Sequence, residues 1–224
     1  MKYFLRLLLY LIVAAPFSAA QAGSYDDYFR AIHSENKGAI LKLFQRGFDP
    51  NTVDEKGRNG FFLAVQVESY GAAEVIAEHP AFDIERTNAA GETPLMVAAL
   101  AGQLELCRKL IARGADVNRP GWTPLHYAAT TEAPELINLL LEHHAYIDAE
   151  SPNRTTPLMM AARYGGYRAF RVLLEGGADP TLKNDKGLSA ADFARLVDRE
   201  RVAKEVEQAA QAFNRPKDAP PAQR

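Results

Sequence analysis

The hydrophobic residues of this 224-residue chain recur in clusters about every 33 residues. Each period holds two apolar segments with helical spacing: the first carries a Leu and a pair of alanines in three of the periods, and the second is rich in Leu, Ile and Val. Apolar residues three and four positions apart share one face of a helix. The pattern therefore predicts a pair of amphipathic helices in every period. The first segments start at residues 59, 93, 123, 156 and 189, so that successive starts lie 34, 30, 33 and 33 residues apart.

The expected helix boundaries carry residues that suit helix ends. Three of the first segments begin with Thr-Pro, where the threonine can cap the helix and the proline fits its first turn. Gly102 and Gly165 predict the turn into the second helix, and Gly114 and Gly177 suit a left-handed cap at its end. One helix pair cannot bury its apolar face alone, so the pattern predicts a stack in which each pair contacts its neighbours.

Two phrases recur in register with these helices. Thr-Pro-Leu-x-x-Ala-Ala stands at Thr93–Ala99, Thr123–Ala129 and Thr156–Ala162, and Gly-Ala-Asp begins at Gly114 and Gly177. Together they resemble the ankyrin repeat family over most of the chain. The resemblance implies an all-α solenoid of stacked helix-turn-helix units with β-hairpin-like fingers. It also implies binding of protein partners through the finger tips and the inner face of the first helices.

The resemblance divides the chain into repeat units that together form one domain, residues 25–208. The second unit is divergent, because Asn59-Gly60 stands where Thr-Pro is expected, and the fourth follows a finger shortened by three residues. The last unit is rich in charge, as expected for a polar outer cap, and residues 209–224 predict a disordered tail. The six expected units are 25–51, 54–84, 87–118, 121–148, 153–180 and 186–208.

Residues 1–22 have the pattern of a cleaved secretory signal peptide. Lys2 and Arg6 precede an apolar stretch of about eleven residues, and Ala20 and Ala22 fit a signal peptidase site. The stretch is too short to span about 30 Å of hydrocarbon, which disfavours an uncleaved anchor. We therefore expect export, to the periplasm or, as the alternative, to the extracellular space.

Composition narrows the function classes. Charged residues make up 24% and hydrophobic residues 47% of the chain, which is typical of a folded globular protein. Loss of Lys2 and Arg6 with the leader changes the formal charge from −2 to −4, since 24 basic residues (26 − 2) then face 28 acidic ones. We therefore expect no nucleic-acid partner. We also expect no membrane attachment after cleavage and a monomer.

The sequence offers no convergent catalytic, cofactor-binding or metal-binding phrase. His126 belongs to the Thr-Pro-Leu-His phrase, in which the family uses histidine for structural hydrogen bonds. His143 and His144 are adjacent at an expected helix end and do not share a helix face, which disfavours a metal site. Cys107, the only cysteine, falls in an apolar stripe and is expected to be buried.

The resemblance places partner contacts on finger residues and on the residue pairs that follow Ala-Ala. Trp122 is the most informative, because Trp, Tyr and Arg are enriched at binding hot spots. Two interpretations remain open for it: an exposed contact, or a ring folded down over the gap in the shortened finger. Arg154 replaces the usual finger glycine, which leaves the conformation of that hairpin open. The candidate protein-binding residues are Trp122, Arg154, Arg163, Tyr164, Thr130, Thr131, Arg58 and Glu92.

These patterns favour a non-enzymatic adaptor that is exported and recognises a protein with a preformed surface. Within that class, an assembly helper for another exported protein competes with an inhibitor or immunity partner of a toxin. A secreted effector that acts on host proteins is a further alternative. An enzyme or metal-dependent activity at His143 and His144 is the interpretation that the sequence supports least.

Overall fold

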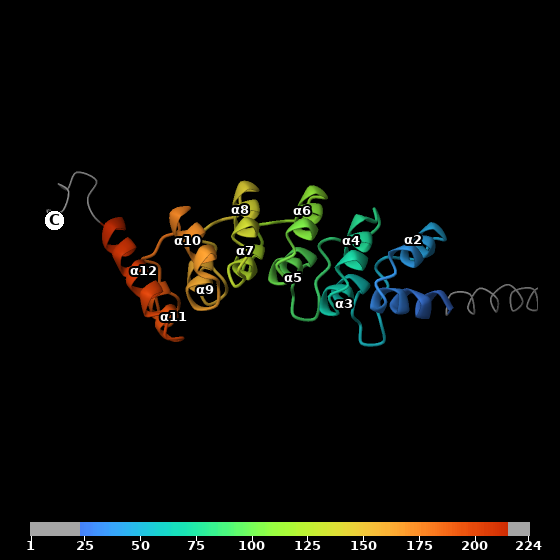
Figure 1. Ribbon diagram of the computed structural model, residues 1–224, viewed down its shortest axis with the longest axis horizontal. Helices are drawn as coiled ribbons and strands as arrows, with labels where there is room; N and C mark the ends of the chain where they lie inside the picture. Colours follow the sequence, from blue (N-terminus) through green and yellow to red (C-terminus); the bar gives the residue numbers. More distant parts are fainter. Residues whose placement is uncertain (1–22, 215–224) are drawn as a thin grey trace, which may run out of the picture. The chain divides into compact units, whose positions relative to one another are not determined.

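The computed structural model describes residues 23–214, so the expected signal peptide and residues 215–224 lie outside the described residues. By its contacts the chain divides into two compact units, Met1–Asp83 and Ile84–Arg224. In the sequence, the first unit ends one residue before the expected end of the second repeat. The described residues form helices and no β-sheet (Figure 1), which confirms the all-α prediction. In the first unit residues 23–33 are helical and are followed by α2 (Lys37–Gln45), α3 (Gly60–Gln66) and α4 (Tyr70–Glu78).

The second unit contains four helix pairs. In each pair the two helices contact one another, and first helices contact first helices of the neighbouring pairs. The second helices α6, α8 and α10 form their own row (Figure 1). The pairs are α5 (Pro94–Leu100) with α6 (Leu104–Ala112), α7 (Pro124–Ala128) with α8 (Pro134–Glu142), α9 (Pro157–Arg163) with α10 (Tyr167–Glu175), and α11 (Ala190–Arg195) with α12 (Glu200–Phe213).

The starts of the first helices are fixed by reciprocal capping hydrogen bonds. The hydroxyls of Thr93 and Thr156 each accept the backbone N–H three residues later, and Met96 and Met159 accept the N–H of the capping threonine through sulfur. This is the geometry of a capping box, in which two otherwise unpaired donors are satisfied together. The Thr-Pro phrase therefore sets these helix starts as predicted.

Left-handed residues follow the second helices α6, α8 and α10, but not α4. Gly114 and Gly177 have φ of 92° and 95°, and His144 occupies the same place with φ of 63°. α4 instead ends in an extended residue, His79. Pro80 follows it, and a residue before proline is driven towards extended conformations.

Gly165 lies in the predicted turn into α10, where its small size is what the structure requires. A Cβ at Gly165 would lie 2.2 Å from the carbonyl oxygen of Ala129 in the preceding repeat, whereas Gly102, in the predicted turn into α6, has a left-handed φ of 67°. Neighbouring backbones approach closely at Gly165. A side chain there would separate the two repeats.

The first unit explains why its second repeat lacks Thr-Pro. Tyr28, from the first helix, is fully buried, and a Cβ at Gly60 would lie 2.3 Å from its hydroxyl oxygen. Asn59 replaces threonine as the cap, because its side-chain oxygen accepts the N–H of Phe61. The divergent Asn-Gly pair is thus an adaptation to the large aromatic residue packed above it.

α12 is longer than predicted and closes the second unit. It continues to Phe213, so the start of the expected tail at residue 209 is wrong for the part of the tail that the structure describes. Residues 208–212 are all alanine or glutamine, which are strong helix formers, and this accounts for the extension. Its inner face buries Val202, Ala203 and Val206.

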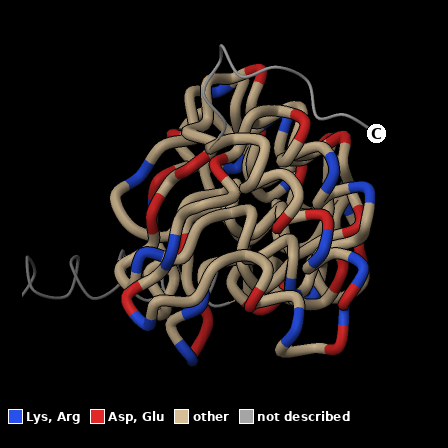
Figure 2. Tube along the Cα trace, turned by 90° about the vertical axis from the view of Figure 1, so that its left-hand side faces the viewer, with Lys and Arg blue, Asp and Glu red and all other residues tan. Residues whose placement is uncertain are grey.

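Basic and acidic residues alternate along the described chain, as the colours of the trace show (Figure 2). Among the described residues, no helix combines the length and the apolar character needed to cross a bilayer.

Candidate interaction surface

The fingers are loops held by one polar side chain at their start. Asn88 accepts the N–H groups of Ala90 and Glu92, and Asn184 accepts those of Lys186 and Leu188. Gly91 and Gly187 then adopt a left-handed φ of 79° and 73°. Each finger therefore has a fixed backbone that presents the side chain just before the next first helix.

Arg154 keeps its finger in the same conformation without a glycine. Its φ is 59°, and its N–H donates to Ser151 O at 2.7 Å. Its guanidinium pairs with Glu150, with Nη2 3.0 Å from Oε1. A left-handed φ is unfavourable for a residue with a Cβ, so this predicted contact residue strains the loop that carries it.

The shortened finger at residues 118–123 gives Trp122 an intermediate setting. The indole packs edge-on against His126, with ring centroids 5.2 Å apart and an interplanar angle of 72°, and 36% of the residue remains exposed. It also lies 6.4 Å from the ring of Tyr127. Trp122 thus both covers the shortened finger and keeps an accessible edge, which combines the two interpretations.

His126 is the buried support of Trp122. Its Nδ1 lies 3.1 Å from the N–H of Thr123, which it accepts, and its Nε2 donates to Thr155 O at 2.9 Å in the next repeat. Burial lowers the pKa of His126, although hydrogen bonds to Thr155 and Ala149 oppose the shift. A neutral imidazole therefore links two repeats, in agreement with the structural role that the family resemblance implies.

Glu92 and Tyr127 form a hydrogen-bonded pair beside Trp122. The Tyr127 hydroxyl donates to Glu92 Oε1 at 3.0 Å, and Asn88 Nδ2 donates to Oε2 at 2.8 Å. Both residues are half-buried. Burial, reinforced by Glu92, raises the pKa of Tyr127 to about 12, so the phenol stays protonated.

The remaining candidates of the second unit lie at the other end of the first helices. The hydroxyls of Thr130 and Thr131 donate to the carbonyls of Tyr127 and Ala128, so they cap their own helix. Arg163 lies over the ring of Tyr164, with Cζ 5.0 Å from the ring centroid, and Tyr164 is 53% exposed.

The structure therefore places the candidates in two groups. Glu92 and Trp122 both lie next to the side chain of Tyr127 in α7, whereas Arg163 and Tyr164 lie at the end of α9. A helix of the length of α9, 7 residues, separates its two ends by about 10 Å. Leu100 and Leu196 are exposed at or just beyond the ends of α5 and α11.

Arg58 belongs to the first unit and is engaged in its own finger. Its guanidinium pairs with Asp54 at 2.7 Å and donates to Gln66 Oε1 at 2.8 Å. The side chain therefore stiffens the connection between the finger and α3.

A sequence model of the family described as "Ankyrin repeats (3 copies)" matches residues 29–120 and 117–184. The chain belongs to the ankyrin-repeat family. Ankyrin repeats generally mediate protein–protein interactions, and ankyrin-repeat proteins are typically non-enzymatic modules.

Curated ankyrin-repeat relatives are similar to this chain over part of their length. The B-cell lymphoma 3 protein homolog of Mus musculus is 30% identical over 169 residues, which cover 71% of this chain and 38% of the relative. The nuclear factor NF-kappa-B p105 subunit of Gallus gallus is 30% identical over 161 residues, covering 69% and 16%. The neurogenic locus notch homolog protein 1 of Danio rerio is 32% identical over 139 residues, covering 59% and 6%. The chain thus spans at most 38% of the length of each of these proteins.

The interior of the ankyrin stack offers no reactive thiol. Cys107 is buried, and burial raises its pKa to about 12. In residues 23–214 no group of three or more His, Cys, Asp and Glu side chains is arranged to hold a metal ion.

Tyr127 is the surface residue that sequence reasoning missed. It stands in the phrase Thr-Pro-Leu-His-Tyr-Ala-Ala, at the position that Val97 and Met160 hold in the neighbouring repeats. The change from an aliphatic to a phenolic side chain at a repeated position was the available signal. The partner of its hydroxyl, Glu92, lies 35 residues earlier and could not be paired with it from the pattern alone.

Proposed function

We propose that this chain is a non-enzymatic protein-interaction module that is exported to the periplasm and binds a partner through the surface of residues 84–214. One observation carries the proposal: large apolar side chains remain exposed at the shortened finger and at or just beyond the ends of three first helices, α5, α9 and α11. Trp122, Leu100, Tyr164 and Leu196 belong to this set, although the same repeats bury a continuous core. Exposed aromatic residues on a rigid scaffold are typical of binding surfaces.

Export is supported by the leader pattern. Lys2, Arg6 and the Ala20-Gln21-Ala22 site have the order of a secretory signal. A single cysteine, buried in the stack, suits an oxidising compartment, where an accessible thiol would be a liability. Protease accessibility of the chain in osmotically shocked and intact cells tests this part of the proposal. Recovery in the cytoplasm with an intact leader would contradict it.

Partner binding is tested by affinity capture from periplasmic extract. The bait is the mature chain, compared with a Trp122→Ala, Tyr164→Ala double variant. Tyr146→Ala is the matched control, because Tyr146 is 69% exposed but lies outside both groups of candidate residues. We expect the parent and the control to retain the same partner and the double variant to lose it. Equal retention by all three would contradict the proposed surface.

The form of the complex distinguishes the possible roles. A tight complex of fixed stoichiometry supports an inhibitor or immunity partner, whereas weak, reversible binding supports an assembly helper. Recovery of the mature chain outside the cell would favour an effector that acts on host proteins.

A further inference from the structure

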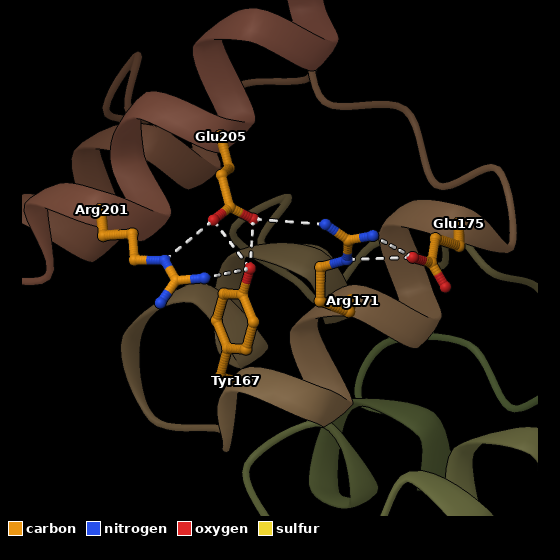
Figure 3. Close-up of polar contacts among 5 residues, drawn as sticks. All are labelled: Tyr167, Arg171, Glu175, Arg201 and Glu205. Atoms are coloured by element: carbon orange, nitrogen blue, oxygen red, sulfur yellow. Dashed lines mark hydrogen bonds and ion pairs between the residues drawn. The ribbon is translucent and has the colours of Figure 1, made fainter.

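A polar cluster between α10 and α12 joins a tyrosine, a glutamate and arginines (Figure 3). The Tyr167 hydroxyl lies 2.8 Å from Glu205 Oε1. Arg201 donates through Nε to the same oxygen at 3.2 Å and through Nη2 to the Tyr167 hydroxyl at 3.0 Å. Its Cζ stands 4.5 Å from the Tyr167 ring centroid. One guanidinium thus satisfies a carboxylate, a phenol and an aromatic face together.

Arg171 completes this cluster from the other side (Figure 3). It lies 3.7 Å from Glu205 Oε2 and also pairs with Glu175 on its own helix. Basic side chains of the same chain therefore already contact this tyrosine–glutamate pair.

Tyr127 and Glu92 form a second tyrosine–glutamate pair, and among residues 23–214 no arginine contacts it. The hydroxyl-to-carboxylate distance is 3.0 Å, close to that between Tyr167 and Glu205. Trp122 stands beside Tyr127 with ring centroids 6.4 Å apart, much as Phe170 stands 6.2 Å from the ring of Tyr167. Among residues 23–214, guanidinium groups lie over the rings of Tyr164 and Tyr167, whereas Glu92 forms no ion pair and neither Trp122 nor Tyr127 lies under a cation.

We propose that Trp122, Tyr127 and Glu92 form a subsite for an arginine side chain of a protein partner. The inference rests on the proposed function, since it names the chemistry of the partner at one part of that surface. A carboxylate accepts about four hydrogen bonds, and the two that Glu92 receives leave lone pairs for an incoming guanidinium. The aromatic faces attract the same cation.

The cluster at Tyr167 favours arginine over lysine as the occupant. A planar guanidinium presents several donors in a fork, so that it reaches a carboxylate and a phenol while it stacks on a ring. An ammonium is a compact point charge and cannot make these contacts in one plane. The geometry of Arg201 around Tyr167 and Glu205 shows the arrangement that the partner would reproduce.

Trp122 supplies a direct readout, because it is the only tryptophan of the chain. The purified full-length protein is titrated with the peptide acetyl-Gly-Arg-Gly-amide while the Trp122 fluorescence and its single indole N–H resonance are followed. The matched probe is acetyl-Gly-citrulline-Gly-amide, which has the same shape and no charge. A lysine peptide of the same length is the third probe, and all titrations are held at equal ionic strength.

The arginine peptide is expected to shift the Trp122 signals in a saturable way, with a dissociation constant on the order of 1 mM for one isolated side chain. The citrulline peptide is expected to bind at least about 10-fold more weakly. Glu92→Gln should weaken arginine binding by about 10-fold, whereas Glu150→Gln, which removes the same charge from an exposed finger residue, should leave it within about 2-fold.

Two results would overturn the subsite: equal shifts with the arginine and citrulline peptides, or unchanged arginine binding in Glu92→Gln. Equal affinity for the lysine peptide would overturn the assignment to a guanidinium. The wild-type comparison of arginine with citrulline needs no variant, so the test survives a variant that fails to fold. A partner captured through Trp122 and Tyr164 in the absence of any arginine response would keep the proposed function and remove this inference alone.

Discussion

Two tyrosine–glutamate pairs on the second unit of this protein have different surroundings. Tyr167 and Glu205 connect α10 to the terminal helix, and Arg201 and Arg171 close the pair from within the chain (Figure 3). Tyr127 and Glu92 connect a first helix to a finger and lie beside Trp122, with no ion pair to Glu92 in the part of the chain described. The tyrosine–glutamate pair at Tyr167 thus holds the terminal helix in place, whereas the pair at Tyr127 forms part of a charged aromatic surface.

The comparison teaches where binding energy is available. At Tyr167 the carboxylate, the phenol and the ring are already satisfied by arginine, so a partner gains little by contacting them. At Tyr127 a partner cation would find acceptors and ring faces that the fold has held in place. Preorganised groups lose little entropy on binding, which is the general advantage of a stiff repeat surface.

The largest difference is expected when each hydroxyl is removed in turn. Tyr167→Phe should lower the free energy of unfolding by about 2 kcal/mol, because Glu205 and Arg201 both lose a hydrogen-bonding partner. Tyr127→Phe should cost about 1 kcal/mol, because only one hydrogen bond to Glu92 is lost. Urea unfolding followed by circular dichroism measures both. Equal losses would show that the arginines contribute nothing to the first pair.

The carboxylates should show the same order with a smaller effect. Glu205→Gln should lower the melting temperature by about 3 °C, since Arg171 and Arg201 lose the carboxylate that they share. Glu92→Gln should lower it by about 1 °C, because no ion pair is broken. A larger decrease for Glu92→Gln than for Glu205→Gln would mean that Glu92 serves the stability of the fold and is not available to a partner.

Acid should lower the stability of the region around Trp122 through His126, on which the indole packs. Since burial lowers the pKa of His126, the unfolded chain binds a proton there at a higher pH than the folded chain does. Its contribution to stability is therefore fully present above about pH 6.5, the ordinary histidine value, and is lost as the pH falls below it.

Urea midpoints measured between about pH 8 and pH 5 test this dependence. His126→Gln is the matched variant, because glutamine can accept from Thr123 and donate to Thr155 without titrating. The variant should lose part of the decrease in stability below about pH 6.5. The same decrease in both proteins would assign the acid sensitivity to other groups.

The remaining change is expected to stabilise the protein, and it lies in the finger that carries Arg154. Arg154→Gly should raise the melting temperature by about 1–3 °C, because glycine adopts the left-handed φ of 59° without strain. The exposed pair with Glu150 should offset little of this gain. A decrease in the melting temperature would mean that the pair with Glu150, and not the loop conformation, dominates at this position.

Much of the fold could be predicted from the sequence because it repeats. The Thr-Pro-Leu phrases set the helix starts, and glycine at 114 and 177 set the helix ends through a left-handed φ. The terminal helix was harder to delimit, since residues 208–212 are helix formers that carry no repeat phrase. Gly165 also showed that the same residue type serves turn conformation in one repeat and close packing in another.

The candidate surface could be predicted only in part. Trp122 and Tyr164 stand out by residue type and position, and the structure exposes both. Thr130 and Thr131 occupy variable positions, yet their hydroxyls are bonded to their own helix. Tyr127 was missed, because its role depends on a hydrogen bond to a finger of the preceding repeat. Pairings between repeats follow from packing and cannot be read from one repeat.

The most direct test of the account is elution of the captured partner. The complex is held on the immobilised chain and washed with the arginine peptide or, at equal concentration and ionic strength, with the citrulline peptide. The account predicts that the arginine peptide releases the partner and that the citrulline peptide leaves it bound. Release by both peptides, or by neither, would contradict recognition of a guanidinium at Trp122, Tyr127 and Glu92.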